Sequence, residues 1–240
     1  MVRGAGEATA GRRGGHQREP EQVALTFESG AGPVSALLDL PPDARWLYVV
    51  AHGAGAGMRH PFLEGIAGAL VGHRIGTFRY QFPYMEAGKR RTDTPKVAAA
   101  AVRAAVDAAA RAAPGVPLLA GGKSFGGRMT STAASEAPLH GVRGIAFLGF
   151  PLHAPGKPGD DRAAHLAGVT VPMLFLQGTR DDFARLELLK PVCERLGERA
   201  TLRLVDGADH SFKVSRRPAA DVLNEVAGAI AAWATRVAAG

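Results

Sequence analysis

The stretch Gly-Lys-Ser-Phe-Gly-Gly at residues 122–127 decides how the rest of the sequence is interpreted. It follows an apolar run, Val116–Ala120, and it opens an Ala-rich segment of helical character. A serine on a sharp turn between a strand and a helix has a strained backbone, and the residues two positions away on either side must be small. Gly122 and Gly126 meet that requirement. The stretch therefore predicts that Ser124 is a nucleophile at the end of a strand.

The chain around this turn alternates short apolar runs with helical segments. Two strands come first and strand–helix alternation follows, which predicts a mostly parallel eight-stranded sheet with helices on both faces and an antiparallel hairpin at one edge. The expected strands are Val23–Glu28, Val34–Leu40, Trp46–Ala51, Arg74–Tyr80, Val116–Ala120, Val142–Phe150, Val171–Gln177 and Thr201–Val205. The expected helices are Phe62–Val71, Pro95–Ala113, Phe125–Ala134, Ala184–Leu196 and Ala219–Ala238.

Two polar residues follow later strands of this predicted sheet. Asp181 comes just after Val171–Gln177, and His210 comes just after Thr201–Val205. Ligands of such sheets bind beyond the carboxyl ends of the strands, and serine, acid, histidine is a chain order known for serine nucleophiles on them. We therefore expect His210 to take the proton of Ser124 and Asp181 to fix the tautomer of His210.

Other residues compete for these roles. Asp182 is adjacent to Asp181 and is an alternative acid, while Asp206 and Asp209 flank the histidine. Cys193 lies on an apolar helical stripe and is interpreted as a core residue rather than a nucleophile. The other seven histidines are interpreted mostly as surface residues: His16, His52, His60, His73, His140, His153 and His165.

A glycine-rich loop, His-Gly-Ala-Gly-Ala-Gly at residues 52–57, directly follows the strand Trp46–Ala51. Its glycines let backbone N–H groups turn inward, so we assign an oxyanion hole to the N–H groups of Ala54 and Phe125. A tight strand-to-helix turn or a phosphate-binding loop is the alternative. The loop lacks the Gly-Lys-Ser/Thr ending of a P-loop and the spacing of a dinucleotide-binding motif.

Length and composition suit one domain. The 240 residues are 46% hydrophobic, which is enough for a sizeable core, and no apolar run is long enough to cross a bilayer. A single cysteine excludes an internal disulfide, and the first residues do not resemble a secretory signal, so we expect a cytoplasmic protein. Residues 1–21 are predicted to be a disordered basic tail, and residues 22–240 one α/β domain.

The net charge of +7 is spread over an Ala-, Gly- and Arg-rich chain and is accompanied by no nucleic-acid recognition motif. We therefore expect no nucleic-acid partner and no membrane partner. No spacing typical of metal ligands is found either, so neither a metal nor another cofactor is expected. The basic positions Lys89, Arg90, Arg91 and Lys96 indicate a solvated loop, with attraction of an anionic substrate as the alternative.

Six motifs lie at residues 52–55, 82–84, 122–128, 149–152, 177–181 and 208–212. Together they resemble those of the small, lidless, dienelactone-hydrolase-like α/β hydrolases. Within them the chain is most similar to predicted hydrolases that include a testis-expressed human protein and the hydrolase-like subunit of a chromatin-associated acetyltransferase complex. The resemblance covers Val23 to Ala238 and implies an α/β-hydrolase fold with Ser124, Asp181 and His210 as the triad. True dienelactone hydrolases use a cysteine nucleophile, so their substrate is not inferred.

These observations favour an enzyme that cleaves a small-molecule carboxylic ester or thioester through an acyl-enzyme on Ser124. The alternatives are an interaction module that keeps the fold without catalysis, and a peptidase or acyltransferase with the same triad. The presence of all three triad residues favours the enzyme. Only Pro151–Thr170 separates the sixth predicted strand from the seventh, which leaves no room for a lid domain.

Overall fold

The computed structural model describes residues 22–239, so the predicted tail at residues 1–21 lies outside the described residues. One eight-stranded sheet runs through the molecule in the order β1-β2-β4-β3-β5-β6-β7-β8. β2 pairs antiparallel with β1 and with β4, and the remaining pairs are parallel, as the order of elements predicts. The strands are β1 Gln22–Glu28, β2 Pro33–Asp39, β3 Trp46–Ala51, β4 Ile75–Tyr80, β5 Leu118–Lys123, β6 Val142–Leu148, β7 Met173–Gly178 and β8 Ala200–Val205.

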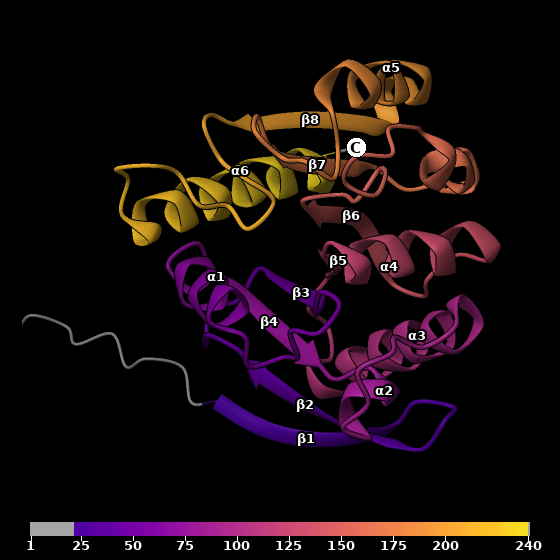
Figure 1. Cartoon of the computed structure of the whole chain (residues 1–240). Coiled ribbons are helices and arrows are strands. Elements are labelled where there is room, and N and C mark those ends of the chain that lie inside the picture. Colours follow the sequence, from indigo (N-terminus) through magenta and orange to yellow (C-terminus); the bar gives the residue numbers. More distant parts are fainter. Residues whose placement is uncertain (1–21, 240) are drawn as a thin grey trace, which may run out of the picture.

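Helices cover both faces of this sheet (Figure 1). On one face α1 and α6 pack against each other, and on the other face lie α3, α4 and α5. Each face has its own cluster of buried apolar side chains, so every residue of the interior strands β3 and β7 is buried. The helices are α1 Pro61–Val71, α2 Pro83–Glu86, α3 Pro95–Ala112, α4 Phe125–Glu136, α5 Leu186–Leu196 and α6 Ala219–Ala239, with the 3₁₀ helices η1 Asp161–Gly168 and η2 Gly197–Arg199.

Strand β5 extends further than its apolar run predicts. It ends at Lys123 rather than at Ala120, because Gly121 and Gly122 also pair with the neighbouring strands. A Cβ atom at Gly122 would lie 2.2 Å from the carbonyl oxygen of Ala51, so no larger residue fits there. The strand therefore leads directly into Ser124 at the carboxyl edge of the sheet.

The connection between β6 and β7 is short and contains one 3₁₀ helix, Asp161–Gly168. No lid domain is inserted there, as the spacing of the two strands predicts. Among residues 22–239, none of the helices combines the length and the apolar character needed to cross a bilayer. Cys193 lies in α5 among Leu189, Val192 and Leu196 and is buried, as its apolar stripe predicts.

Candidate active site

Ser124 occupies a strained turn between β5 and α4. Its φ of 50° and ψ of −114° lie in the left-handed half of backbone space, which non-glycine residues adopt only when their surroundings force it. The Ser124 N–H donates to the carbonyl of Leu148 at 3.2 Å, and the Arg128 N–H donates to the carbonyl of Ser124 at 3.1 Å. A Cβ at Gly126 would lie 2.5 Å from the carbonyl oxygen of Ala51, so α4 begins directly against the end of β3.

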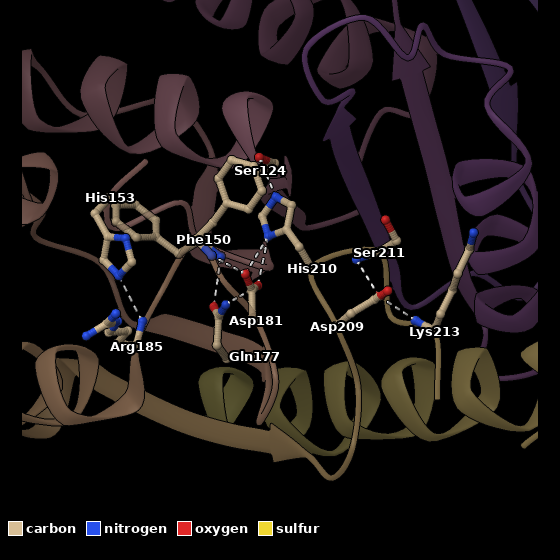
Figure 2. A network of polar contacts seen from close by, with 11 residues as sticks. Ser124, Phe150, His153, Gln177, Asp181, Arg185, Asp209, His210, Ser211 and Lys213 are labelled. Carbon is tan, nitrogen blue, oxygen red and sulfur yellow. Dashed lines mark hydrogen bonds and ion pairs between the residues drawn. The ribbon is translucent and has the colours of Figure 1, made fainter. Parts of the chain in front are cut away.

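The structure brings Ser124, His210 and Asp181 into one chain of hydrogen bonds (Figure 2). Nε2 of His210 lies 2.8 Å from Oγ of Ser124, and Nδ1 of His210 lies 2.7 Å from Oδ2 of Asp181. An ionised carboxylate only accepts hydrogen bonds, so Nδ1 carries the proton and Nε2 offers a lone pair to the serine hydroxyl. This arrangement is suited to removing the proton of Ser124.

The Asp181 carboxylate is buried and held from three directions. Besides the imidazole contact, Oδ1 accepts a hydrogen bond from the N–H of Phe183 at 2.8 Å, and Oδ2 accepts one from Nε2 of Gln177 at 2.5 Å. Gln177 is itself buried, and its Oε1 accepts from the N–H of Phe150 at 2.9 Å, so the amide links the acid to the loop after β6 (Figure 2). Gln177 belongs to one of the six sequence motifs, but nothing in the motif indicates this role.

The competing carboxylates lie elsewhere. Asp182 is exposed, and Asp206 accepts a hydrogen bond from the hydroxyl of Thr179. Asp209 accepts from the backbone N–H groups of Ser211 and Lys213 at 2.8 and 2.9 Å, so it shapes the loop that carries the histidine (Figure 2). Of these candidates, the geometry gives Asp181 alone a contact with the imidazole among residues 22–239.

The glycine-rich loop after β3 lies beside Ser124. A Cβ at Gly53 would be 3.9 Å from the Cβ of Ser124, so the loop passes close to the serine. Within residues 22–239 neither the N–H of Ala54 nor that of Phe125 donates to an acceptor. Phe125 is the first residue of α4, where the helix end also carries partial positive charge. Both groups are therefore free to stabilise an oxyanion.

His52 corrects the expectation of a surface residue, because its side chain is fully buried. The Phe82 N–H donates to its Nε2 at 3.0 Å, so the proton is on Nδ1, which donates to the carbonyl of Gly53 at 2.8 Å. The carbonyl of Gly53 and the N–H of Ala54 belong to one planar peptide and point in opposite directions. His52 therefore fixes the direction of the Ala54 N–H, and burial lowers the pKa of His52 to about 4.

His153 also departs from the expectation of a surface residue, because it is buried. Its Nε2 accepts from the N–H of Arg185 at 3.0 Å, which joins the loop after β6 to the start of α5 (Figure 2). His165 is partly buried, with Nε2 2.8 Å from Oγ of Ser131, whereas His60, His73 and His140 are exposed as expected. His16 lies outside the described residues. The sequence around a single histidine does not indicate whether its side chain is buried or exposed.

A cavity of about 270 Å³ opens in front of the serine. Phe183 forms one wall and stacks on the ring of His210 with centroids 4.2 Å apart. The basic positions at 89–91 and Lys96 are exposed and do not line the cavity, in keeping with a solvated loop. The lining residues are Gly53, Ala54, Ala56, His60, Phe62, Leu63, Lys123, Ser124, Phe183, His210 and Ser211.

The arrangement of possible metal ligands and the environment of the single cysteine can be described for residues 22–239. Among residues 22–239, no three His, Cys, Asp or Glu side chains are grouped so that they could hold a metal ion. Burial raises the pKa of the Cys193 thiol to about 11, so that thiol stays protonated at neutral pH and is a poor nucleophile.

Comparisons with known proteins agree with this architecture. The sequence profile of a family described as "Alpha/beta hydrolase domain" matches residues 44–237. A lidless α/β serine hydrolase from Xanthomonas campestris, XC6422, is 23% identical, with 90% of this chain and 94% of that chain covered and a TM-score of 0.71. A dienelactone hydrolase from Anabaena variabilis is 21% identical, with 91% of this chain and 99% of that chain covered and a TM-score of 0.72. An esterase domain from Rhodothermus marinus is 20% identical, with 90% of this chain and 98% of that chain covered and a TM-score of 0.69.

Proposed function

The chain belongs to the alpha/beta hydrolase domain family, and from this premise we propose that it is a serine hydrolase acting on a small carboxylic ester or thioester. The observation that carries the proposal is the hydrogen-bond chain from Ser124 through His210 to Asp181, with links of 2.8 and 2.7 Å. A fold kept only for interaction has no need of a strained serine with a free pair of N–H donors beside it.

The proposed reaction proceeds through an acyl-enzyme. Nε2 of His210 takes the hydroxyl proton as Oγ of Ser124 bonds to the substrate carbonyl carbon, and the N–H groups of Ala54 and Phe125 bind the resulting oxyanion. The imidazolium then gives its proton to the departing alcohol or thiol, and the carbon–oxygen or carbon–sulfur bond breaks. Water, deprotonated by the same imidazole, releases the acid and restores the serine.

The size of the cavity supports a small acyl group. Its volume of about 270 Å³ is below the roughly 300–1,000 Å³ of typical sites for drug-sized ligands. We also propose that the chain belongs to the dienelactone-hydrolase-like branch, together with the testis-expressed and chromatin-associated hydrolase-like proteins. The motifs at residues 52–55 and 122–128 support that placement. Serine at position 124, in place of cysteine, argues for an ester or thioester other than dienelactone.

Labelling with a fluorophosphonate probe tests the proposal directly, because the probe reacts with activated serine hydroxyls. We expect the parent protein to be labelled and Ser124→Ala to lose both labelling and cleavage of 4-nitrophenyl acetate, with an unchanged melting temperature. Ser135→Ala removes another hydroxyl, from the far end of α4, and should be labelled like the parent. Equal labelling of Ser124→Ala and the parent would contradict the proposal.

A further inference from the structure

Lys123, the last residue of β5, carries a buried ammonium group next to the serine. Within residues 22–239 its Nζ is shielded from solvent and makes no hydrogen bond. Burying a charged group without a partner is unfavourable, so such a position is retained only where another interaction offsets the cost. The residue also contributes to the lining of the cavity in front of Ser124, and it takes no part in the reaction steps proposed above.

The ammonium group borders the hydrogen bond between His210 and Asp181. A Cβ placed on Gly149 would lie 3.2 Å from Nζ of Lys123, 3.4 Å from Nδ1 of His210 and 3.5 Å from Oδ2 of Asp181. Gly149 has a φ of +73°, which strongly favours glycine, so its missing side chain leaves these three groups facing the same small space. Nζ also lies 5.7 Å from the ring centroid of Phe212, within the range of a cation–π contact.

Three titratable groups face the ammonium, from two loops. Asp181 follows β7, and Asp209 and His210 follow β8; His60, the residue before α1, lines the same cavity as Lys123. Burial lowers the pKa of Lys123 to about 8, and the two carboxylates oppose that shift. The neighbouring carboxylates of Asp181 and Asp209 thus favour the ammonium form of Lys123.

We propose that Lys123 is a positioning residue whose buried charge keeps Asp181 ionised and His210 neutral. A cation beside the imidazole disfavours the imidazolium form, whereas the carboxylate favours it. The ammonium thus offsets part of the effect of Asp181 and leaves more of the imidazole able to accept the Ser124 proton in mildly acidic solution. The proposal rests on the proposed function, because it concerns the base of the same reaction.

The test compares Lys123→Met with Lys213→Met. Both changes remove one positive charge, but Lys213 is exposed and points away from His210 (Figure 2), so its charge is screened by solvent. The protonation midpoint of His210 is read by NMR titration of ¹³C-labelled histidine, assigned from the signal that disappears in His210→Gln. The second readout is the pH profile of kcat/KM for 4-nitrophenyl acetate between pH 5 and 9.

We expect Lys123→Met to raise the His210 midpoint by about one pH unit and to move the acid limb of the profile by the same amount. Activity at pH 6 then falls by up to about tenfold, while activity near pH 8.5 changes little. Lys213→Met should move the midpoint by less than about 0.2 unit because its charge is screened. Lys123→Gln, which keeps a polar group without the charge, should behave like Lys123→Met.

Two results would overturn the proposal. One is an unchanged His210 midpoint in Lys123→Met, and the other is an equal loss of activity at every pH, which indicates a packing role. The NMR titration does not require turnover. If Ser124→Ala keeps its labelling, the proposed function fails, and the titration still decides the role of Lys123. Melting temperatures of all variants verify that they are folded.

Discussion

At the scale of single residues, both oxygens of Asp181 accept hydrogen bonds. Oδ1 accepts from the N–H of Phe183 and Oδ2 accepts from Gln177, while Nδ1 of His210 lies 2.7 Å from Oδ2 and 3.0 Å from Oδ1. An asparagine has only one acceptor oxygen, and its NH₂ group would take the place of the other oxygen. There it would face a hydrogen-bond donor, which is a backbone or amide N–H or Nδ1–H of the imidazole. The histidine would then adopt the other tautomer, with Nε2 protonated and unable to accept the proton of Ser124.

We therefore predict that Asp181→Asn lowers kcat for 4-nitrophenyl acetate by about 10⁴-fold, the loss typical of the acid in such a triad. Asp182→Asn is the matched control, because the neighbouring side chain is exposed and should change kcat by less than about twofold. A larger loss in the control would mean that the acid is Asp182.

The sequence alone predicts which polar side chains form the candidate site when those side chains directly follow strands. Ser124, Asp181 and His210 occur in a recognised order at strand ends, and parallel strands bring such ends to one edge of the sheet, so their meeting can be inferred from chain order. The supporting roles of His52, Gln177 and Lys123 cannot be inferred in this way. These residues act through hydrogen bonds and charges between loops, and those distances are set by how the sheet twists and pairs rather than by local sequence.

At the scale of elements, a buried ion pair joins β2 to β4. The guanidinium of Arg79 lies 2.8 Å from Oδ2 of Asp39, and it also donates to the carbonyl of Met58, in the segment between the glycine-rich loop and α1. Both side chains are largely shielded from water, with exposures of 2% and 13%. This pair fastens the antiparallel edge of the sheet to the segment that positions the loop.

Removing one partner of such a pair leaves the other charge buried, and we predict that Arg79→Ala lowers the free energy of unfolding by about 3–5 kcal/mol. Arg217→Ala breaks an exposed pair of similar length, 2.7 Å to Glu225, and should cost less than about 1 kcal/mol. Urea denaturation at neutral pH measures the free energy of unfolding of both variants. Similar costs for the two variants would show that burial of the first pair contributes little.

Helices with a regular spacing of apolar residues can be predicted from the sequence, whereas very short helices cannot. α6 carries apolar residues at three- and four-residue steps, and its expected end lies within one residue of the observed end. α2 has four residues, Pro83–Glu86, which is too few to show a period, and it is absent from the expected helices. Its Tyr84 nevertheless accepts a hydrogen bond from the N–H of Gly55 at 3.1 Å, so this short helix braces the glycine-rich loop.

At the scale of the whole molecule, the missing lid limits how much acyl chain can be buried. Each buried methylene of the acyl chain contributes about 0.8 kcal/mol to the binding free energy, so a deep site would show a steep rise in kcat/KM with the length of that chain. We predict instead that acetyl to butyryl esters are cleaved best in a series of 4-nitrophenyl esters, without activation at a lipid interface. A maximum at ten or more carbons would contradict this.

The same open cavity has a consequence for the fate of the acyl group. Closing an active site prevents hydrolysis of a reactive intermediate, so transfer of an acyl group to a chosen acceptor is favoured by a closed chamber. Here the ester bond on Ser124 would form at the mouth of a small cavity, and residues 22–239 hold no separate domain that could close over it. Bulk water then competes with every acceptor at its full concentration, so the partition of the intermediate favours the free acid over a transferred product.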